Sequence, residues 1–405
     1  DVRVEDEQAK ININSAPYSL LGNLFGASFL AEEVEEGAST IRVEDPSVFP
    51  EKNGLVRIGT ELVRYSERRG DALVGVQRGV DSDRPWNSQG RAWGKGTLVT
   101  DAVAFEIATY PIRIREGQMT PYQNAYQVKR IAELGSVALD PEVLDETLGM
   151  LTCYSGREVA GGWSNTQKVR SALPSGTSDT GGDSFVVDNP MYFGRGTLVR
   201  ITDGTNIDYG MVVDVRGSEV HLGNTVKHDY QADRARVQTY ARHPVNVNTA
   251  SDEVLIACME NVELRLRSRD SVTREEAVKV IERLREEPVR SLYHYHDILK
   301  TAASDGLIST HDYYALYFNS LNPQDRRLAF ATVPFCFKSY DTYTVSATAV
   351  VNSKAGEEVA RKSVRRVVSV HPRKSSVWTL ESQDDFEMQI IASRDAPYFM
   401  TYPYN

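Results

Sequence analysis

Three aspartates lie close enough together in the sequence to hold a metal ion. Asp179, Asp183 and Asp188 fall in and just beyond residues 161–183, a Gly- and Ser-rich segment that we expect to be a mobile loop. Carboxylate oxygens are the ligands that Ca²⁺ prefers, so these residues are a candidate calcium site, and calcium is the only cofactor that the sequence suggests. The spacing is not that of an EF-hand, and a solvated acidic loop is the simpler interpretation.

Histidine and cysteine do not indicate a second metal site. His294 and His296 are two residues apart on a predicted helix, where they point to different faces and cannot hold one ion between them, even with His311 or Cys258 nearby. We expect these histidines to lie on the surface or to pack between helices. No CxxC pair occurs among the three cysteines, which argues against a zinc ribbon or a redox pair: Cys153, Cys258 and Cys336.

The residues that could do chemistry do not form the arrangement of a known enzyme class. The sequence contains no GxSxG, HExxH or Walker loop. With 46 Lys and Arg against 56 Asp and Glu, the net charge is −10, whereas nucleic-acid binding depends on basic residues gathered on one face. We therefore expect a protein that is not an enzyme and does not bind nucleic acid.

Two short asparagine elements are the most specific motifs. The first has the form Lys-x-Asn-x-Asn and the second the form Val-Asn-x-Asn-Thr-Ala; their polar residues are Lys10, Asn12 and Asn14, and Asn246, Asn248 and Thr249. Small polar side chains of this kind bond neighbouring backbone groups, end an extended segment and cap the helix that follows. Each element therefore predicts the start of a helical segment.

A chain that carries both elements resembles the K-type minor pseudopilins of type II secretion systems. Their soluble region opens with an acidic stretch and a Lys-x-Asn-x-Asn element, and later carries Val-Asn-x-Asn-Thr-Ala. The likeness covers residues 1–30 and 243–371, including predicted helices over 252–320 and the entry to the last strands at Phe337–Val345. The hydrophobic amino-terminal helix that anchors such proteins is missing from this sequence.

The resemblance implies a structural subunit at the tip of a secretion pseudopilus. It would cap the fibre or start its assembly through contacts with other minor pseudopilins, and it could contact secreted cargo. It would lie in the periplasm, attached to the inner membrane only through the missing helix; the opening Asp1 leads us to expect that a leading segment has been removed. Because these proteins bind calcium in their helical insertion, the resemblance also supports the aspartate site.

The same Val-Asn-x-Asn-Thr-Ala element also opens helix-hairpin-helix modules, some of which bind DNA. Those modules hold phosphate on a Gly-rich hairpin, whereas residues 259–263 here contain no Gly and two carboxylates, Glu260 and Glu263. Phosphate would be repelled, which again argues against nucleic acid as a partner.

A second pair of similar stretches indicates two small β modules. Residues 43–49 recur as residues 187–193, each with Pro three positions before Phe, and each is followed by Leu-Val-Arg-Ile, at Leu55–Ile58 and Leu198–Ile201. Short alternating runs separated by Gly, Asp and Asn follow in both, as is typical of strands joined by tight turns. We predict a duplicated β unit.

Taken together, the sequence predicts an α+β fold: a pilin-like antiparallel sheet, an inserted helical domain of the helix-hairpin-helix or SAM-like kind, and two all-β modules. The expected parts are 1–38 with 321–405 for the sheet and tail, 39–104 for the first module, 105–183 for a helical segment and loop, 184–242 for the second module, and 243–320 for the helical domain. The β modules leave one alternative function open, a phage-tail-like or cell-surface adhesion module.

Overall fold

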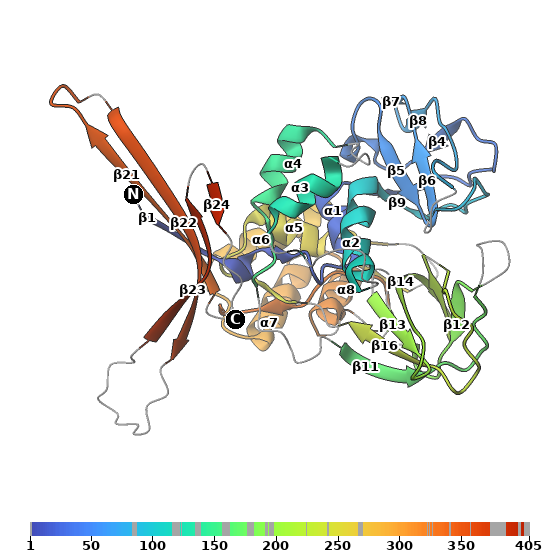
Figure 1. Ribbon diagram of the computed structural model, residues 1–405. Helices are drawn as coiled ribbons and strands as arrows, with labels where there is room; N and C mark the ends of the chain where they lie inside the picture. The colour runs from blue at the N-terminus through green and yellow to red at the C-terminus, as the bar shows by residue number, and fades with distance from the viewer. Residues whose placement is uncertain are drawn as a thin grey trace, which may run out of the picture.

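The computed structural model has an α+β fold in which helices and several small sheets follow one another along the chain. Figure 1 shows a sheet that projects to one side of a central helical body, with two small β structures on the other side. The structure describes residues 2–82, 87–115, 122, 124–133, 139–155, 163–175, 182–190, 193, 198–223, 225–240, 243–265, 270–321, 323, 325, 327–339, 342–356, 358–372, 386–395 and 398–400.

The projecting sheet, which we name the terminal sheet, joins an early strand to the last strands of the sequence. Its strands pair antiparallel in the order β1-β21-β22-β23-β24, which are Val2–Asp6, Thr342–Asn352, Glu358–Pro372, Phe386–Asp395 and Tyr398–Met400. The predicted strand pair over 343–351 and 364–370 is confirmed, with the turn at residues 353–356. In the pairing of β1 with β21, Val4 lies opposite Val345.

The helical body encloses the largest apolar core, to which all eight helices of the described residues contribute or against which they pack. Its helices are α1 (Tyr18–Phe25), α2 (Ala102–Arg115), α3 (Tyr126–Glu133), α4 (Pro141–Leu148), α5 (Asp252–Met259), α6 (Arg274–Arg285), α7 (Leu292–Ser304) and α8 (Thr310–Leu321). The capping box predicted for α6 is present, since Thr273 N–H donates to Glu276 Oε2 at 2.9 Å and Glu276 N–H donates to Thr273 Oγ1 at 3.2 Å. The predicted Asp140 cap of α4 is present too.

Short segments tie the helices together. The pairs of strands are β2 with β10, β17 with β20, and β18 with β19, whose bounds are Ile11–Asn12, Leu151–Thr152, Val245–Asn246, Phe335–Cys336, Glu263–Leu264 and Leu328–Phe330; the 3₁₀ helix η1 is Glu7–Ala9. No helix among the described residues is long and apolar enough to cross a bilayer.

The two β structures, module 1 and module 2, have the same strand order. Module 1 contains β3 to β9, at Ala27–Phe29, Thr40–Arg42, Leu55–Ile58, Glu61–Arg64, Glu67–Arg69, Ala72–Val74 and Leu98–Asp101. Module 2 contains β11 to β16, at Trp163–Lys168, Ser184–Val186, Leu198–Thr202, Ile207–Arg216, Glu219–Leu222 and Arg236–Tyr240. Module 2 runs β11-β16-β13-β14-β15-β12, and module 1 runs β3-β9-β5-β6 and then β7-β8-β4. The bulged strand β14 of module 2 occupies the position that two strands, β6 and β7, occupy in module 1. With this equivalence, the strand orders of the two modules coincide.

Equivalent positions in the two modules also match in detail. The isolated bridges Leu30 to Val43 and Val34 to Trp93 in module 1 correspond to Val169 to Val187 and Leu173 to Tyr230 in module 2. Ten of the eleven buried core positions of module 1 have counterparts in the core of module 2, the exception being Val63, at whose position module 2 has Gly210. In order, Leu30, Val34, Ile41, Val43, Phe49, Val56, Ile58, Tyr65, Leu73 and Val99 match Val169, Leu173, Phe185, Val187, Phe193, Val199, Ile201, Val212, Val220 and Val237. These matches indicate duplication of one unit.

Two expectations from the sequence need correction. Each module begins one strand earlier than residue 39 or residue 184, because β3 and β11 complete the sheets. Residues 163–168, which we expected within a mobile loop, form strand β11 instead. This strand pairs antiparallel with β16, with Lys168 opposite Arg236. An edge strand of polar residues lacks the apolar alternation that marks a strand in a sequence.

Candidate functional site: a polar junction between the terminal sheet and the helical body

The two asparagine elements occupy equivalent places in the helical body. In the first, Ile11 and Ile13 N–H groups donate to the carbonyls of Met150 and Thr152, both at 2.9 Å. In the second, Val245 and Val247 donate to Pro334 and Cys336 at 3.1 and 3.0 Å. Each element is thus a short parallel strand that precedes a helix, α1 or α5.

Within each element, the first asparagine closes a local turn. Asn12 Oδ1 accepts from Asn14 N–H at 3.0 Å, and Asn246 Oδ1 accepts from Asn248 N–H at 3.2 Å. The expectation that these residues cap the next helix is wrong in its detail: α1 begins after Pro17 without a side-chain cap, and α5 is capped by Ser251. The asparagines end the strand, and the cap lies further along.

The remaining amide groups of the elements connect distant segments. Asn12 Nδ2 donates to the carbonyl of Ser155 at 2.8 Å. Asn248 Nδ2 donates to the carbonyls of Val289 and Phe337 at 2.9 and 3.0 Å, and its Oδ1 accepts from Val289 N–H at 2.8 Å. Asn248 therefore ties the α6–α7 connection to the segment that leads into the terminal sheet.

Asp6, the last residue of β1, links that strand to the second element. Its Oδ2 accepts from Asn246 Nδ2 and Thr249 Oγ1, both at 2.8 Å. Its Oδ1 accepts from Ser339 Oγ at 2.8 Å and from Gln8 N–H at 3.0 Å. One carboxylate thus holds the base of the terminal sheet against the helical body.

Glu7 and Lys10 form a second, more deeply buried link. Glu7 is 2% exposed, and its carboxylate accepts from Lys10 Nζ at 2.8 Å, from Thr344 Oγ1 of β21 at 2.6 Å and from Thr152 Oγ1 of β10. Lys10 Nζ also donates to Glu5 Oε2 at 3.0 Å. Burial of Glu5 opposes its ionisation, but Lys10, together with Arg3 and Arg365, outweighs burial and lowers the pKa of Glu5. A buried charge with this many partners fixes geometry and leaves little freedom to react.

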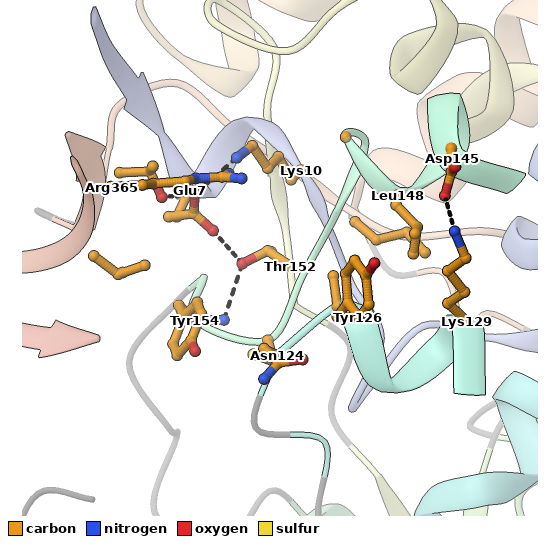
Figure 2. Close-up of a pocket in the computed structure, with 16 residues that line it drawn as sticks. Glu7, Lys10, Asn124, Tyr126, Lys129, Asp145, Leu148, Thr152, Tyr154 and Arg365 are labelled. Carbon is orange, nitrogen blue, oxygen red and sulfur yellow. Dashed lines mark hydrogen bonds and ion pairs between the residues drawn. The ribbon is translucent and has the colours of Figure 1, made fainter. Parts of the chain in front are cut away.

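A pocket of about 450 Å³ opens beside this link (Figure 2). Glu7, Lys10 and Thr152 line one side, and Tyr154 and Arg365 extend the lining toward the terminal sheet. Figure 2 shows Glu7 between Lys10 and Thr152, with the Arg365 side chain close by. This side of the pocket therefore presents bonded polar groups at the junction of sheet and body.

The opposite side of the pocket comes from α3 and α4. Lys129 Nζ and Asp145 Oδ1 form an ion pair at 2.8 Å, with Tyr126 and Leu148 beside them (Figure 2). The only thiol in the lining, that of Cys153, has a pKa that burial raises to about 12, so it stays protonated and is a poor nucleophile. This side of the lining therefore combines an ion pair with apolar and aromatic side chains.

Of the three predicted calcium ligands, the structure describes Asp183 and Asp188. Asp188 is paired with Arg170, whose Nε lies 2.9 Å from Asp188 Oδ2 and which also pairs with Asp233. That guanidinium lowers the pKa of Asp188. The carbonyl of Asp183 accepts from Leu222 N–H at 2.6 Å, and Asp179 lies outside the described residues. A calcium ion at Asp188 Oδ2 would compete with Arg170.

The histidines expected to pack between helices or on the surface take up different settings. On α7, His294 Nε2 lies 3.3 Å from Glu287 Oε1. His296 Nε2 lies 2.9 Å from Ser320 Oγ, and its ring contacts that of Tyr317 at a tilt of 44°. His311 is the residue whose surroundings the sequence did not reveal, since it lies with Asp270 and Asp312. The adjacent pair His311-Asp312 at a helix start was the only available signal.

Comparisons with known proteins leave these features without a close parallel. No family model matches the chain, and no curated protein matches it in sequence. Among solved structures, part of the chain is similar to the Gp54 tailspike of Acinetobacter baumannii bacteriophage AP22 in complex with A. baumannii capsular saccharide, at 12% identity and a TM-score of 0.17. That similarity covers 22% of this chain and 18% of the tailspike chain.

Proposed function

We propose that this chain is a structural subunit of a pilin-like assembly, of the K-type minor pseudopilin kind, and acts by binding other minor pseudopilins. The observation that carries the proposal is the junction at Asp6 and Glu7, where β1 and the last strands meet a helical body entered through two asparagine elements. This combination supports an interrupted pilin-like sheet, with the helical body as its insertion.

The terminal sheet offers a surface for such a contact. Successive side chains of a strand point to opposite faces, and Thr344 faces the helical body because it bonds Glu7. Beyond the base of the sheet, the alternate positions of β21 therefore face away, and in β1 and β21 they are apolar: Val2 and Val4 of β1, and Val345, Ala347, Ala349 and Val351 of β21. Opposite them in β22 lie Val364 and Ala360, but also Arg366 and Lys362. Val2, Val4 and Val351 are 68%, 61% and 59% exposed.

An apolar sheet face that remains exposed is typical of an interaction site. Each large aliphatic side chain that a partner covers contributes about 1.5–3 kcal/mol, so a few valines suffice for a specific contact. We assign this sheet face to contacts with neighbouring pilin-like subunits. In such an assembly, this chain would lie in the bacterial periplasm.

A position at the fibre tip follows from the bulk of the helical body and the two modules. Figure 1 shows them on one side of the terminal sheet, where they would clash with a further subunit stacked above. A tip subunit needs unlike contacts on one side only, because like contacts from head to tail propagate an open filament.

Light scattering on this chain, on the soluble regions of candidate minor pseudopilins and on their mixtures tests the proposal. We expect a monomer alone and a complex of defined mass in the mixture. Filaments formed by this chain alone, or no complex with any pilin-like subunit, would contradict the proposal. Binding to a cell-surface glycan without such a complex would instead favour an adhesion module.

A further inference from the structure

A cluster of potential metal ligands lies in the helical body, away from the junction. Asp270 precedes α6, and His311 and Asp312 are in the first turn of α8. One ligand atom of each lies within 4.8 Å of those of the other two. We propose that Asp270, His311 and Asp312 bind a divalent transition-metal ion such as Zn²⁺.

The separations between the ligand atoms fit an ion better than they fit direct hydrogen bonds. His311 Nδ1 is 3.8 Å from Asp270 Oδ2 and 3.7 Å from Asp312 Oδ1. Hydrogen bonds of this kind span about 2.7–3.2 Å. With metal–ligand bonds of about 2.0–2.1 Å, two ligands on a tetrahedral Zn²⁺ lie roughly 3.3–3.4 Å apart. A small inward movement of each side chain would therefore place all three on one ion.

The atoms that face one another lack partners in the part of the chain that the structure describes. Asp312 is 1% exposed, and its Oδ2 accepts from Ser309 N–H at 3.0 Å. Its Oδ1 and both ring nitrogens of His311 are buried and have no hydrogen bond to any described residue. Buried polar atoms are nearly always bonded, and one cation would satisfy both Asp312 Oδ1 and His311 Nδ1.

The electrostatics of the cluster favour a cation. The carboxylates of Asp270 and Asp312 meet at one imidazole, and the Glu276 carboxylate lies near Asp312, so the surroundings carry negative charge that a cation would neutralise. An imidazole binds a metal ion through a ring nitrogen, and neither ring nitrogen of His311 has a hydrogen bond to a described residue.

The ligand types select among metals. Imidazole nitrogen with two carboxylates suits Zn²⁺ and related first-row ions, whereas Ca²⁺ takes oxygen ligands in larger number. The site is therefore distinct from the acidic cluster around Asp183 and Asp188. It also does not depend on the function proposed above, since it lies outside the terminal sheet and its junction.

Titration calorimetry with ZnCl₂ on the untagged full chain, freed of metal with a chelator, tests the site at neutral pH. We expect one bound ion per chain, and affinity weakened about tenfold or more in His311→Gln and in Asp270→Asn. Asp270 is exposed, so the second variant should fold even if changes near the buried Asp312 do not. His294→Gln is the matched control, because His294 faces the single carboxylate of Glu287.

Two results would overturn the proposal: no Zn²⁺ binding by the unaltered chain, or binding that both His311→Gln and Asp270→Asn leave unchanged. A visible spectrum of the Co²⁺-loaded chain gives a second readout, with ligand-field bands expected for the unaltered chain and for His294→Gln and reduced in His311→Gln. Addition of millimolar Ca²⁺ should not displace Zn²⁺; displacement would also count against a nitrogen-containing site.

Discussion

Asp6 joins three segments that are far apart in the sequence through a single carboxylate. Its four partners all donate, from Gln8, Asn246, Thr249 and Ser339. The Asp6→Asn variant keeps the shape but turns an amide NH₂ toward hydrogen-bond donors. We expect the free energy of unfolding to fall by about 2–3 kcal/mol, measured by urea denaturation, because bonds to a charged group are lost and donors are left unsatisfied.

The matched control for Asp6→Asn is Asp71→Asn. Asp71 makes an exposed ion pair with Arg42 at 2.7 Å, and pairs of this kind contribute about 0–1 kcal/mol. A loss no larger for Asp6→Asn than for Asp71→Asn would show that the junction does not depend on this carboxylate.

The buried carboxyl group of Asp101 should make the free energy of unfolding depend on pH. The residue is fully buried, and burial raises its pKa to about 7, although Val103 N–H donates to Oδ1 at 2.9 Å. The unfolded chain releases this proton near pH 4. Between about pH 4 and 7 the folded state therefore holds one proton more, and the contribution of Asp101 to the free energy of unfolding falls as pH rises.

Replacement by a neutral side chain should remove this dependence. Relative to the unaltered protein, Asp101→Asn is expected to gain up to roughly 4 kcal/mol between pH 4 and 8, seen in urea midpoints at several pH values. Asp203→Asn is the control: backbone N–H groups of Asn206 and Thr205 lower the pKa of Asp203, so it stays ionised from pH 5 upward. Parallel pH profiles for Asp101→Asn and the unaltered protein would refute the prediction.

At the level of elements, each module is fastened by a buried carboxylate at an equivalent position. In module 1, Glu61 accepts from Trp93 Nε1 at 2.7 Å and from Arg78 Nη2 at 2.7 Å. In module 2, Asp208 accepts from Tyr230 Oη at 3.0 Å and from His228 Nδ1 at 3.0 Å. Trp93 and Tyr230 form the equivalent bridges, so the carboxylate–aromatic contact is part of the repeated unit.

The two carboxylates should differ in their effect. Glu61→Gln leaves Arg78, whose side chain is 9% exposed, without its charged partner, at a cost of about 3–5 kcal/mol, whereas Asp208→Asn should cost about 1–2 kcal/mol. Hydrogen exchange read by mass spectrometry should show β5, β6 and β9 losing protection in Glu61→Gln while α5 and α6 are unaffected. Equal losses in both modules for the two variants would contradict this account.

The sequence predicted those elements whose signals are local. The Thr273 capping box, the Asp140 cap and the turn at residues 353–356 were all found where expected, because each depends on residues a few positions apart. The early strands β3 and β11 were missed, since short edge strands gain their pairing only from the rest of the sheet.

Contacts between residues far apart in the sequence were harder to predict for the same reason. The sequence indicated that the asparagine elements matter, but not that Asn246 bonds Asp6, because that contact joins strand β1 to a segment beyond both modules. The cluster of Asp270, His311 and Asp312 joins the segment before α6 to the first turn of α8, a contact that no spacing along the chain reveals. The calcium prediction overlooked Arg170, the partner of Asp188.

On the scale of the whole molecule, the terminal sheet and the modules lie on opposite sides of the helical body (Figure 1). The double variant Val4→Lys with Val351→Lys places charges on the outer face of the sheet without entering the core. We expect complex formation with pilin-like subunits to weaken about tenfold or more in light-scattering titrations, with an unchanged melting temperature.

A charge of the same kind on module 2 serves as the control for that surface. Ile207 is 42% exposed and β-branched like valine, and it lies in β14, so Ile207→Lys should leave complex formation intact. Equal weakening by Ile207→Lys and by the sheet variant would mean that the apolar face is not the contact surface.

The pairing of β1 with β21 also sets an order of events during folding. Thr344 and Glu7, which bond across this junction, are 337 residues apart in sequence. Closing so long a loop is slow compared with forming the local pairs inside the modules and between neighbouring helices. The helical body and the modules can therefore fold while β1 is still unpaired. During that interval the exposed valines of β1 can form incorrect strand pairs. A chaperone that holds β1 during synthesis would raise the yield of folded protein more than one that acts on either module.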